Sequence, residues 1–225
     1  DVYKRQVQTF THEVKSPLSA IRGAAELLQE PSMPHEERER FLANIARETQ
    51  RIQEIVDRMM ELTALETRRA LERTQPVALA SLIDDIAISA RSAAAQRNIR
   101  VHVDIRAEAS VEGDPFLLRR AVSNLLDNAI DFSPTGSEVR MTLETTSRLA
   151  RVSVRDRGPG IPDYAQEKVF QKFYSLARPH SQKKSTGLGL AFVKEIAALH
   201  HGRIELGNAT RGGAVATLTL PLLSP

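Results

Sequence analysis

With 225 residues, of which 41% are hydrophobic, the chain is long enough for one or two domains and can build an apolar core. It contains no Cys, which excludes a disulfide scaffold and a thiolate metal site, and its formal net charge of +3 excludes a strongly basic nucleic-acid surface. No run of about 18 apolar residues and no signal-peptide pattern occurs, so we expect no membrane contact by this part of the chain. Since the chain begins at DVYKRQ without Met, we expect it to be a fragment of a longer protein.

Two long amphipathic helices are predicted first. Apolar residues recur at helical spacing over 7–29, PSMP at 31–34 breaks the pattern, and a second helix follows with apolar residues close to heptad spacing. A single antiparallel hairpin cannot cover its own apolar stripe, whereas two paired hairpins form a four-helix bundle. We therefore expect a homodimer. The alternative is that the stripe packs on the rest of the same chain.

The pattern changes after Pro76, so we predict a helical domain over 1–75 and a mixed domain over 76–225. In the second domain the alternation and capping signals indicate an α+β sandwich, in which helices cover one side of a single sheet. Its helices are expected over 79–96, from Asp114-Pro115 to about Phe132, and over 163–170 and 187–200. Its strands are expected at RVHVDI (100–105), VRMTLET (139–145), ARVSVRD (150–156), RIELGN (203–208) and AVATLTL (214–220).

The segment NLLDNAIDFSP (124–134) carries the first motif. Asn124 and Asn128 are separated by four residues, so both amides lie on one helical face. An amide carbonyl is a neutral oxygen ligand that suits a largely hydrated Mg²⁺ ion bridging phosphates. The alternative is a pair of surface or capping asparagines.

The second motif, DRGPGIP (156–162), directly follows a predicted strand. Gly158 and Gly160 permit a tight turn and a close approach of the backbone to a ligand, and Asp156 supplies an acceptor at the mouth of a pocket. The alternative is an ordinary turn.

The third motif is KKSTGLGLAFVKEI (183–196), in which Gly187 and Gly189 lead into a helix. A glycine-rich loop at a helix N-terminus presents free N–H groups to phosphate, and Lys183 and Lys184 add positive charge. Between this motif and the second, Phe170 and Phe173 are spaced to anchor one end of a loop, and the polar segment after them is predicted to be a mobile lid. A plain surface loop is the alternative.

Taken in this order over about 65 residues, the motifs resemble the ATP-binding domain of the histidine-kinase, gyrase, chaperone and mismatch-repair ATPases, the Bergerat fold. The Phe pair between the two glycine motifs resembles the histidine-kinase branch. No G-x-x-x-x-G-K-[ST] segment occurs, which excludes a P-loop NTPase.

The segment HEVKSP (12–17) is similar to the phosphoacceptor box of sensor histidine kinases. A zinc-protease H-E-x-x-H motif fails because Ser16 stands where the second His would be. Neutral imidazole is a nucleophile near pH 7, and Glu13 can accept the proton that attack on a phosphoryl group leaves on the ring. Pro17 removes the helical hydrogen bond to the carbonyl of Glu13, so we expect a bendable point at the reactive turn.

Within this family, the blocks THEVKSPLSAIRGAAELL, NLLDNAIDFSP, IPDYA, KFYSLARP and STGLGLAFVKEIA resemble the CreC-type, carbon-source-responsive kinases of Gram-negative bacteria. The resemblance implies ATP and Mg²⁺ as cofactors, autophosphorylation of a histidine and transfer of the phosphate to an aspartate of a response regulator. It implies His12 as phosphoacceptor, Glu13 as general base, Ser16 as the phosphatase position and Asn128 as the Mg²⁺ ligand. The implied nucleotide-binding residues are Asn124, Asn128, Asp156 (to the adenine amino group), Gly158, Gly160, Phe170, Phe173, Lys183, Lys184, Thr186, Gly187, Leu188 and Gly189.

One position departs from the family pattern. Many members carry Lys or Arg three residues after the second asparagine, where this chain has Asp131. A carboxylate directed inward would repel phosphate, so either Asp131 points away or a lid cation, Arg178, Lys183 or Lys184, takes the role.

The implied partners are a second copy of the chain and the receiver domain of a cognate response regulator, which we expect to dock near Ile21 and Arg22. No nucleic acid is expected, and the implied location is the cytoplasmic portion of a bacterial inner-membrane protein. Two other classes stay open, a non-signalling ATPase such as a chaperone-like clamp and a catalytically silent dimeric scaffold. Phosphate on His12 would discriminate against both.

Overall fold

The structure is a computed structural model that describes residues 2–178 and 185–223; the side chains of residues 2–10 and of His12 also lie outside the described part. The chain divides into two compact units, Asp1–Ala64 and Leu65–Pro225. The functional domain boundary between residues 75 and 76 stays a prediction.

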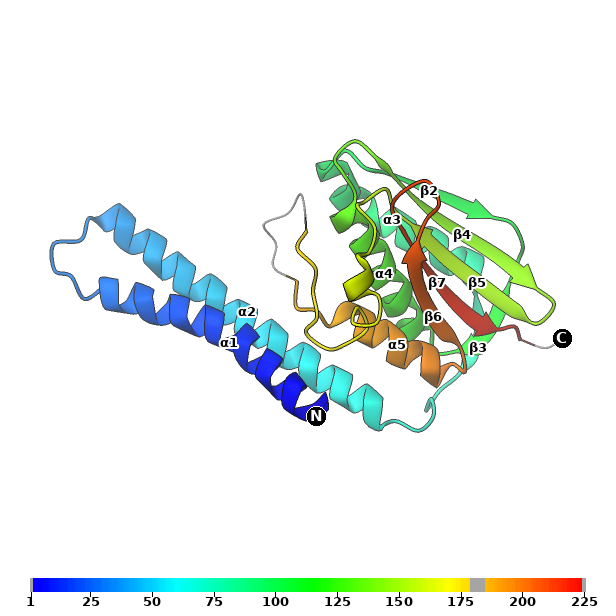
Figure 1. Ribbon diagram of the computed structural model, residues 1–225, viewed down its shortest axis with the longest axis horizontal. Helices are drawn as coiled ribbons and strands as arrows, with labels where there is room; N and C mark the ends of the chain where they lie inside the picture. The colour runs from blue at the N-terminus through cyan, green and yellow to red at the C-terminus, as the bar shows by residue number, and fades with distance from the viewer. Residues whose placement is uncertain (1, 179–184, 224–225) are drawn as a thin grey trace. The chain divides into compact units, whose positions relative to one another are not determined.

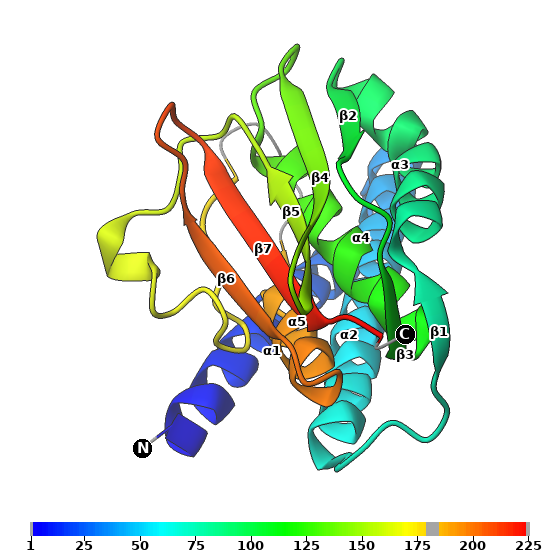
Figure 2. The same cartoon turned by 90° about the vertical axis from the view of Figure 1, so that its right-hand side faces the viewer.

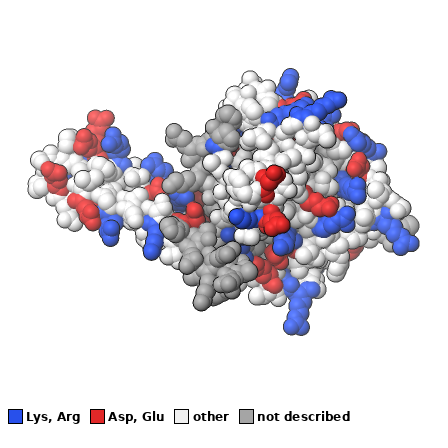
Figure 3. Space-filling model, in the orientation of Figure 1, with Lys and Arg blue, Asp and Glu red and all other residues white. Residues whose placement is uncertain are grey.

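The first unit is a helical hairpin. Helix α1 (Val2–Leu27) and helix α2 (His35–Thr67) run antiparallel and are joined by a short connection, as predicted (Figure 1). The last three residues of α2 belong to the second unit. Ala24 and Ile55 are buried, and α1 remains helical through Pro17. Basic and acidic side chains are interspersed over the face of the hairpin that is visible in Figure 3.

The second unit is built on a five-stranded mixed sheet with the order β2-β4-β5-β7-β6. Strand β2 pairs in parallel with β4, and the other neighbours are antiparallel. Alternate residues of the strands face the core, and Val139, Met141 and Leu143 are fully buried. The strands are β2 (Arg100–Ile105), β4 (Glu138–Thr146), β5 (Leu149–Arg155), β6 (Arg203–Asn208) and β7 (Ala214–Pro221).

Three helices cover one face of this sheet, namely α3 (Leu79–Gln96), α4 (Pro115–Phe132) and α5 (Gly189–Leu199) (Figures 1 and 2). The predicted α+β sandwich is therefore confirmed. Helix α4 begins where the Asp114-Pro115 signal predicts, because the Asp114 carboxylate accepts hydrogen bonds from the N–H groups of Phe116 and Leu117.

The structure also contains a small second sheet that the sequence analysis did not predict. Strands β1 (Gln75–Ala78) and β3 (Ser110–Gly113) pair antiparallel, with Pro76 opposite Glu112. Each strand has four residues, and β1 contains a Pro, which is tolerated in edge strands. Such short segments lack the alternation that would have predicted them.

The helix predicted over 163–170 is wrong. Only Asp163–Ala165 is helical, as a 3₁₀ turn labelled η1. The bonds from Lys168 N to Ala165 O and from Gln171 N to Lys168 O continue the chain in successive turns, and Ala165 and Val169 are buried in a small apolar cluster. Burial of these two side chains produced the helix-like spacing. Within residues 2–178 and 185–223, no helix combines the length and apolar character needed to cross a membrane.

Candidate functional site

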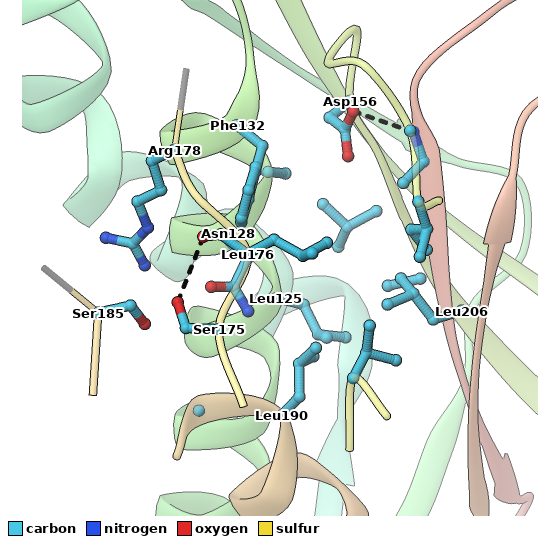
Figure 4. A pocket seen from close by; sticks show the side chains of 18 of the residues that line it. Leu125, Asn128, Phe132, Asp156, Ser175, Leu176, Arg178, Ser185, Leu190 and Leu206 are labelled. Carbon is cyan, nitrogen blue, oxygen red and sulfur yellow. Dashed lines mark hydrogen bonds between the residues drawn. The ribbon is translucent and has the colours of Figure 1, made fainter. Parts of the chain in front are cut away.

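A pocket opens in the second unit, lined by residues of α4, the start of α5 and strands β5, β6 and β7 (Figure 4). Most of its described wall is apolar, and a few polar side chains come from α4, from the end of β5 and from the segments around residues 175–178 and 185. This is the usual composition of a small-molecule site. The apolar residues of the wall are Leu125, Ala129, Phe132, Val154, Pro159, Ile161, Val169, Leu176, Leu190, Leu206, Ala214 and Ala216.

Asp156 follows the last residue of β5 and is only 7% exposed. Its Oδ1 accepts hydrogen bonds from the N–H groups of Gly158 at 2.7 Å and Ala214 at 3.0 Å. Burial raises the pKa of the Asp156 carboxyl above its ordinary value, and the two backbone bonds and Arg155 oppose this shift. Both bonds use Oδ1, and the residue lines the pocket, so Oδ2 can accept a hydrogen bond from a ligand (Figure 4).

Asn124 and Asn128 lie on the face of α4 that is turned toward the start of α5. A Cβ atom added at Gly189 would lie 3.4 Å from Asn124 Oδ1 and 4.0 Å from Asn128 Nδ2. Two amide side chains therefore meet the N-terminus of a helix at one end of the pocket. Free N–H groups and the helix dipole favour phosphate there, and amide oxygens suit a hydrated divalent cation.

Gly187 and Phe173 hold the two ends of the predicted lid together. The N–H of Phe173 donates to the carbonyl of Gly187 at 2.9 Å, and Gly187 has a φ of +65°. A Cβ at Gly187 would lie 2.5 Å from the carbonyl carbon of Phe173, so only glycine fits. The Phe173 side chain is buried, and it supports the loop without lining the pocket.

The turn after β5 is fixed by the strand end of β6. Asn208 accepts a hydrogen bond from Ile161 N at 2.6 Å and donates one to Ile161 O at 2.9 Å. Gly160 has a φ of +79°, and a Cβ there would lie 2.6 Å from Asn208 Oδ1. Gly213 has a φ of +84°, and its Cβ would collide with the Asp156 carbonyl oxygen. These contacts locate Asp156 at the pocket.

Asp131, on the last turn of α4, lies between two arginines. Its Oδ2 is 2.6 Å from Arg178 Nη1, and its Oδ1 is 4.0 Å from Arg97 Nη1. Arg178 lines the pocket, and its guanidinium carbon is 5.9 Å from the centre of the Phe132 ring.

The predicted nucleotide-binding residues therefore fall into three groups. Those that line the pocket are Asn128, Asp156, Gly160, Gly187 and Gly189. Those that support its wall or lie beside it are Asn124, Gly158, Phe170, Phe173, Thr186 and Leu188. Lys183 and Lys184 lie outside the described residues.

Residues that the motifs did not predict are Asn208, Gly213 and Ala214, together with the apolar strand residues. The Gly212-Gly213 dipeptide before an alternating strand was a usable signal for a tight approach. No local signal distinguishes Asn208 from any asparagine at a strand end, because its partner is 47 residues away.

The predicted phosphoacceptor segment lies in α1. His12 is part of the helix, Ser16 is exposed and Pro17 is buried. The Glu13 carboxylate forms an ion pair with Arg51 of α2, with Oε2 and Nη2 separated by 3.6 Å. This contact orients Glu13 against the second helix of the hairpin.

Comparisons with known families agree with both parts of the chain. Residues 3–68 match the His Kinase A (phospho-acceptor) domain, and residues 113–224 match the family of histidine kinase-, DNA gyrase B- and HSP90-like ATPases. The sensor protein CreC of Escherichia coli strain K12 is 42% identical over 217 residues, which are 96% of this chain and 45% of that protein. The chain thus spans about half of the length of this curated relative.

Solved structures give the same result. The mycobacterial sensor histidine kinase MprB is 30% identical with a TM-score of 0.60, covering 68% of this chain and all of that one. The histidine kinase ThkA, in complex with the response regulator protein TrrA, is 25% identical with a TM-score of 0.76, covering 95% of this chain and 60% of that one. The resemblance found from the motifs, including its CreC-type character, is confirmed.

Proposed function

Because this chain belongs to the sensor histidine kinases, we propose that it is the catalytic core of one: it phosphorylates itself on His12 with ATP and passes the phosphoryl group to an aspartate of a response regulator. The observation that carries the proposal is the pocket of the second unit. It combines the buried acceptor Asp156 with an asparagine pair that faces the glycine-rich start of α5.

In this proposal the adenine ring lies against the apolar wall, and Asp156 Oδ2 accepts a hydrogen bond from its exocyclic amino group. The phosphates lie at the end of the pocket formed by Asn124, Asn128, Gly187 and Gly189. Backbone N–H groups there stabilise the charge that develops on the transferred phosphoryl group. Base recognition at Asp156 and phosphate binding at the two asparagines therefore take place at different ends of the pocket.

The residues present also fit Mg²⁺. Asn128 offers a neutral amide oxygen, with Asn124 one helical turn away, and this donor set suits an ion that keeps most of its waters and bridges phosphates. When bound, Mg²⁺ would supply charge neutralisation at the phosphates.

At the hairpin, a ring nitrogen of His12 forms a bond to the γ-phosphorus while the bond from that phosphorus to the β–γ bridging oxygen breaks and ADP leaves. Glu13 takes the proton from the other ring nitrogen. The ion pair with Arg51 holds the Glu13 carboxylate in place on the hairpin. An aspartate of the regulator then accepts the phosphoryl group from phosphohistidine.

The exposed apolar side chains of the hairpin support the proposed homodimer. Four large ones, Leu18, Leu27, Leu42 and Met60, are between 48% and 67% exposed. A second hairpin would cover such side chains in a four-helix bundle. We further propose that the receiver domain docks on α1 near Ile21 and Arg22, that Ser16 positions water for dephosphorylation of the regulator, and that the whole protein is held in the inner membrane.

The proposal is tested by incubating the purified protein with γ-labelled ATP and Mg²⁺. His12→Gln is the variant, and His35→Gln, an exposed histidine on the same hairpin, is the matched control. We expect acid-labile, base-stable label on the wild type and on His35→Gln, and none on His12→Gln. Equal label on all three proteins would refute His12 as the acceptor. A wild type that binds ATP and dimerises but takes no label would favour a silent scaffold.

A further inference from the structure

The cluster of Asp131, Arg97 and Arg178 is the charged feature at the phosphate end of the pocket. One carboxylate lies between two guanidinium groups, which come from the segment after α3 and from the predicted lid. The side chains are 26%, 18% and 12% exposed, respectively. Because two cations share one anion, the cluster carries a net positive charge, although α4 contributes a carboxylate.

The two arginines have different tasks. Arg97 donates hydrogen bonds to the backbone carbonyls of Ile130 and Ser133 and so closes the C-terminal end of α4. Its Nη1 is 4.0 Å from Asp131 Oδ1, which is longer than the two hydrogen bonds to the backbone carbonyls. Arg97 is therefore a structural part of the helix end.

Arg178 is paired directly with Asp131. Its Nη1 is 2.6 Å from Asp131 Oδ2, and its Nε is buried without a hydrogen-bond partner among the described residues. Residues 174–178 have no regular secondary structure that would hold the side chain. A buried donor without an acceptor is a costly feature, and a ligand oxygen would satisfy it.

Arg178 is also at the correct end of the pocket for a phosphate. Figure 4 shows it beside Ser175, Ser185 and Asn128, on the opposite side of the pocket from Asp156. A guanidinium has five N–H donors, so it can keep one bond to Asp131 and donate others to phosphate oxygens. Among the described residues that line the pocket, Arg178 is the only one with a basic side chain.

We propose that Asp131 is a positioning residue, which by pairing with Arg178 places a guanidinium at the phosphate end of the pocket, where Arg178 binds the terminal phosphates of the nucleotide. The inference rests on the proposed ATP site and adds to it the source of the positive charge. In this arrangement the carboxylate at position 131 assists phosphate binding through a lid residue, instead of opposing it.

The test is calorimetric titration of the protein with Mg·AMPPNP, Mg·ADP and adenosine. Arg178→Ala is expected to lose affinity for both phosphorylated ligands, roughly tenfold for one lost charge-assisted contact, and to bind adenosine like the wild type. Asp131→Asn is expected to show a smaller loss of the same kind. Arg157→Ala is the matched control, since Arg157 also pairs with a carboxylate at 2.7 Å, Glu138, but does not line the pocket.

The double variant Asp131→Asn/Arg178→Ala decides whether Asp131 acts through Arg178. We expect it to bind Mg·AMPPNP no more weakly than Arg178→Ala, because the positioning residue has nothing left to position. Additive losses, or equal losses for adenosine and AMPPNP, would overturn the inference and leave the pair a structural contact. If the wild type binds adenosine and AMPPNP while Arg178→Ala is unchanged, this inference fails and the proposed function stands. If the wild type binds no nucleotide, both fail.

Discussion

Replacing Asp156 by Asn should invert the base preference of the pocket. The Asp156 Oδ1 atom accepts from Gly158 N at 2.7 Å and from Ala214 N at 3.0 Å. An asparagine must keep its carbonyl oxygen there, because the reversed amide would direct its NH₂ group at two N–H donors. The NH₂ group then takes the place of Oδ2 and faces the purine at C6, where adenine also has a donor.

The magnitude follows from the lost contact. A hydrogen bond to a charged acceptor contributes about 1.5–3 kcal/mol, which corresponds to roughly 10- to 150-fold in the Kd for ADP. Hypoxanthine carries a carbonyl at C6, which accepts from the new NH₂ group, so IDP should bind the variant better than it binds the wild type. The free energy of unfolding should change by only about 1 kcal/mol, because the weaker hydrogen bonds from Gly158 and Ala214 are offset by the removal of a buried charge.

The assay is titration of both proteins with Mg·ADP and Mg·IDP, together with a thermal unfolding curve. The decisive quantity is the ratio of the two Kd values, since a general distortion of the pocket would weaken both nucleotides equally. A ratio that does not change between wild type and Asp156→Asn would refute direct recognition of the adenine amino group by Asp156.

Three further predictions address the loop, the fold and the kinase helix. Gly187→Ala should lower the affinity for ADP and the thermal stability, because its Cβ would collide with Phe173. Gly136→Ala is the control: it has a φ of +82° but open space around it, so its free energy of unfolding should fall only by the roughly 1–2 kcal/mol of left-handed strain. Equal losses in the two variants would contradict the steric argument. Burial lowers the pKa of His200 below its ordinary value, so over part of the acid range the unfolded chain binds a proton that the native His200 does not. The free energy of unfolding should therefore fall as the pH drops through 6.5 toward the native pKa of His200, and a denaturant titration series should find this pH dependence reduced in His200→Gln. Pro17→Ala restores a helical N–H in α1, so the hairpin should unfold at a higher temperature. The kinase and phosphatase rates of the whole sensor protein should also change. Unchanged rates would show that Pro17 has no role in signalling.

Local patterns predicted the features that depend on neighbouring residues. Helix α4 begins at Asp114-Pro115 because capping is a contact within one turn, and Asn124 and Asn128 share a face because helical periodicity puts them there. The five strands of the large sheet follow from their alternation.

The two wrong or missing predictions have a common cause. The spacing of Ala165 and Val169 indicated a helix, whereas the structure has a 3₁₀ turn and further turns that bury both side chains in a small cluster. Strands β1 and β3 are too short for a periodic signal and exist because they pair with each other, from Gln75 opposite Gly113 to Ala78 opposite Ser110. In both cases packing decided the local conformation.

By itself, the sequence determined the class of the protein, since the order of the HEVKSP, asparagine and glycine motifs is a one-dimensional property. It also predicted which residues can bind a nucleotide, because donors, acceptors and glycines are chosen by their chemistry. Only the tertiary structure decided which of these residues meet. Asn208 reaches Ile161, Gly213 approaches Asp156, and Arg178 pairs with Asp131 through contacts between segments far apart in the chain. The negative charge of Asp131, which the sequence suggested would repel a phosphate, is compensated by Arg178 and Arg97, because electrostatic interactions depend on distance in space.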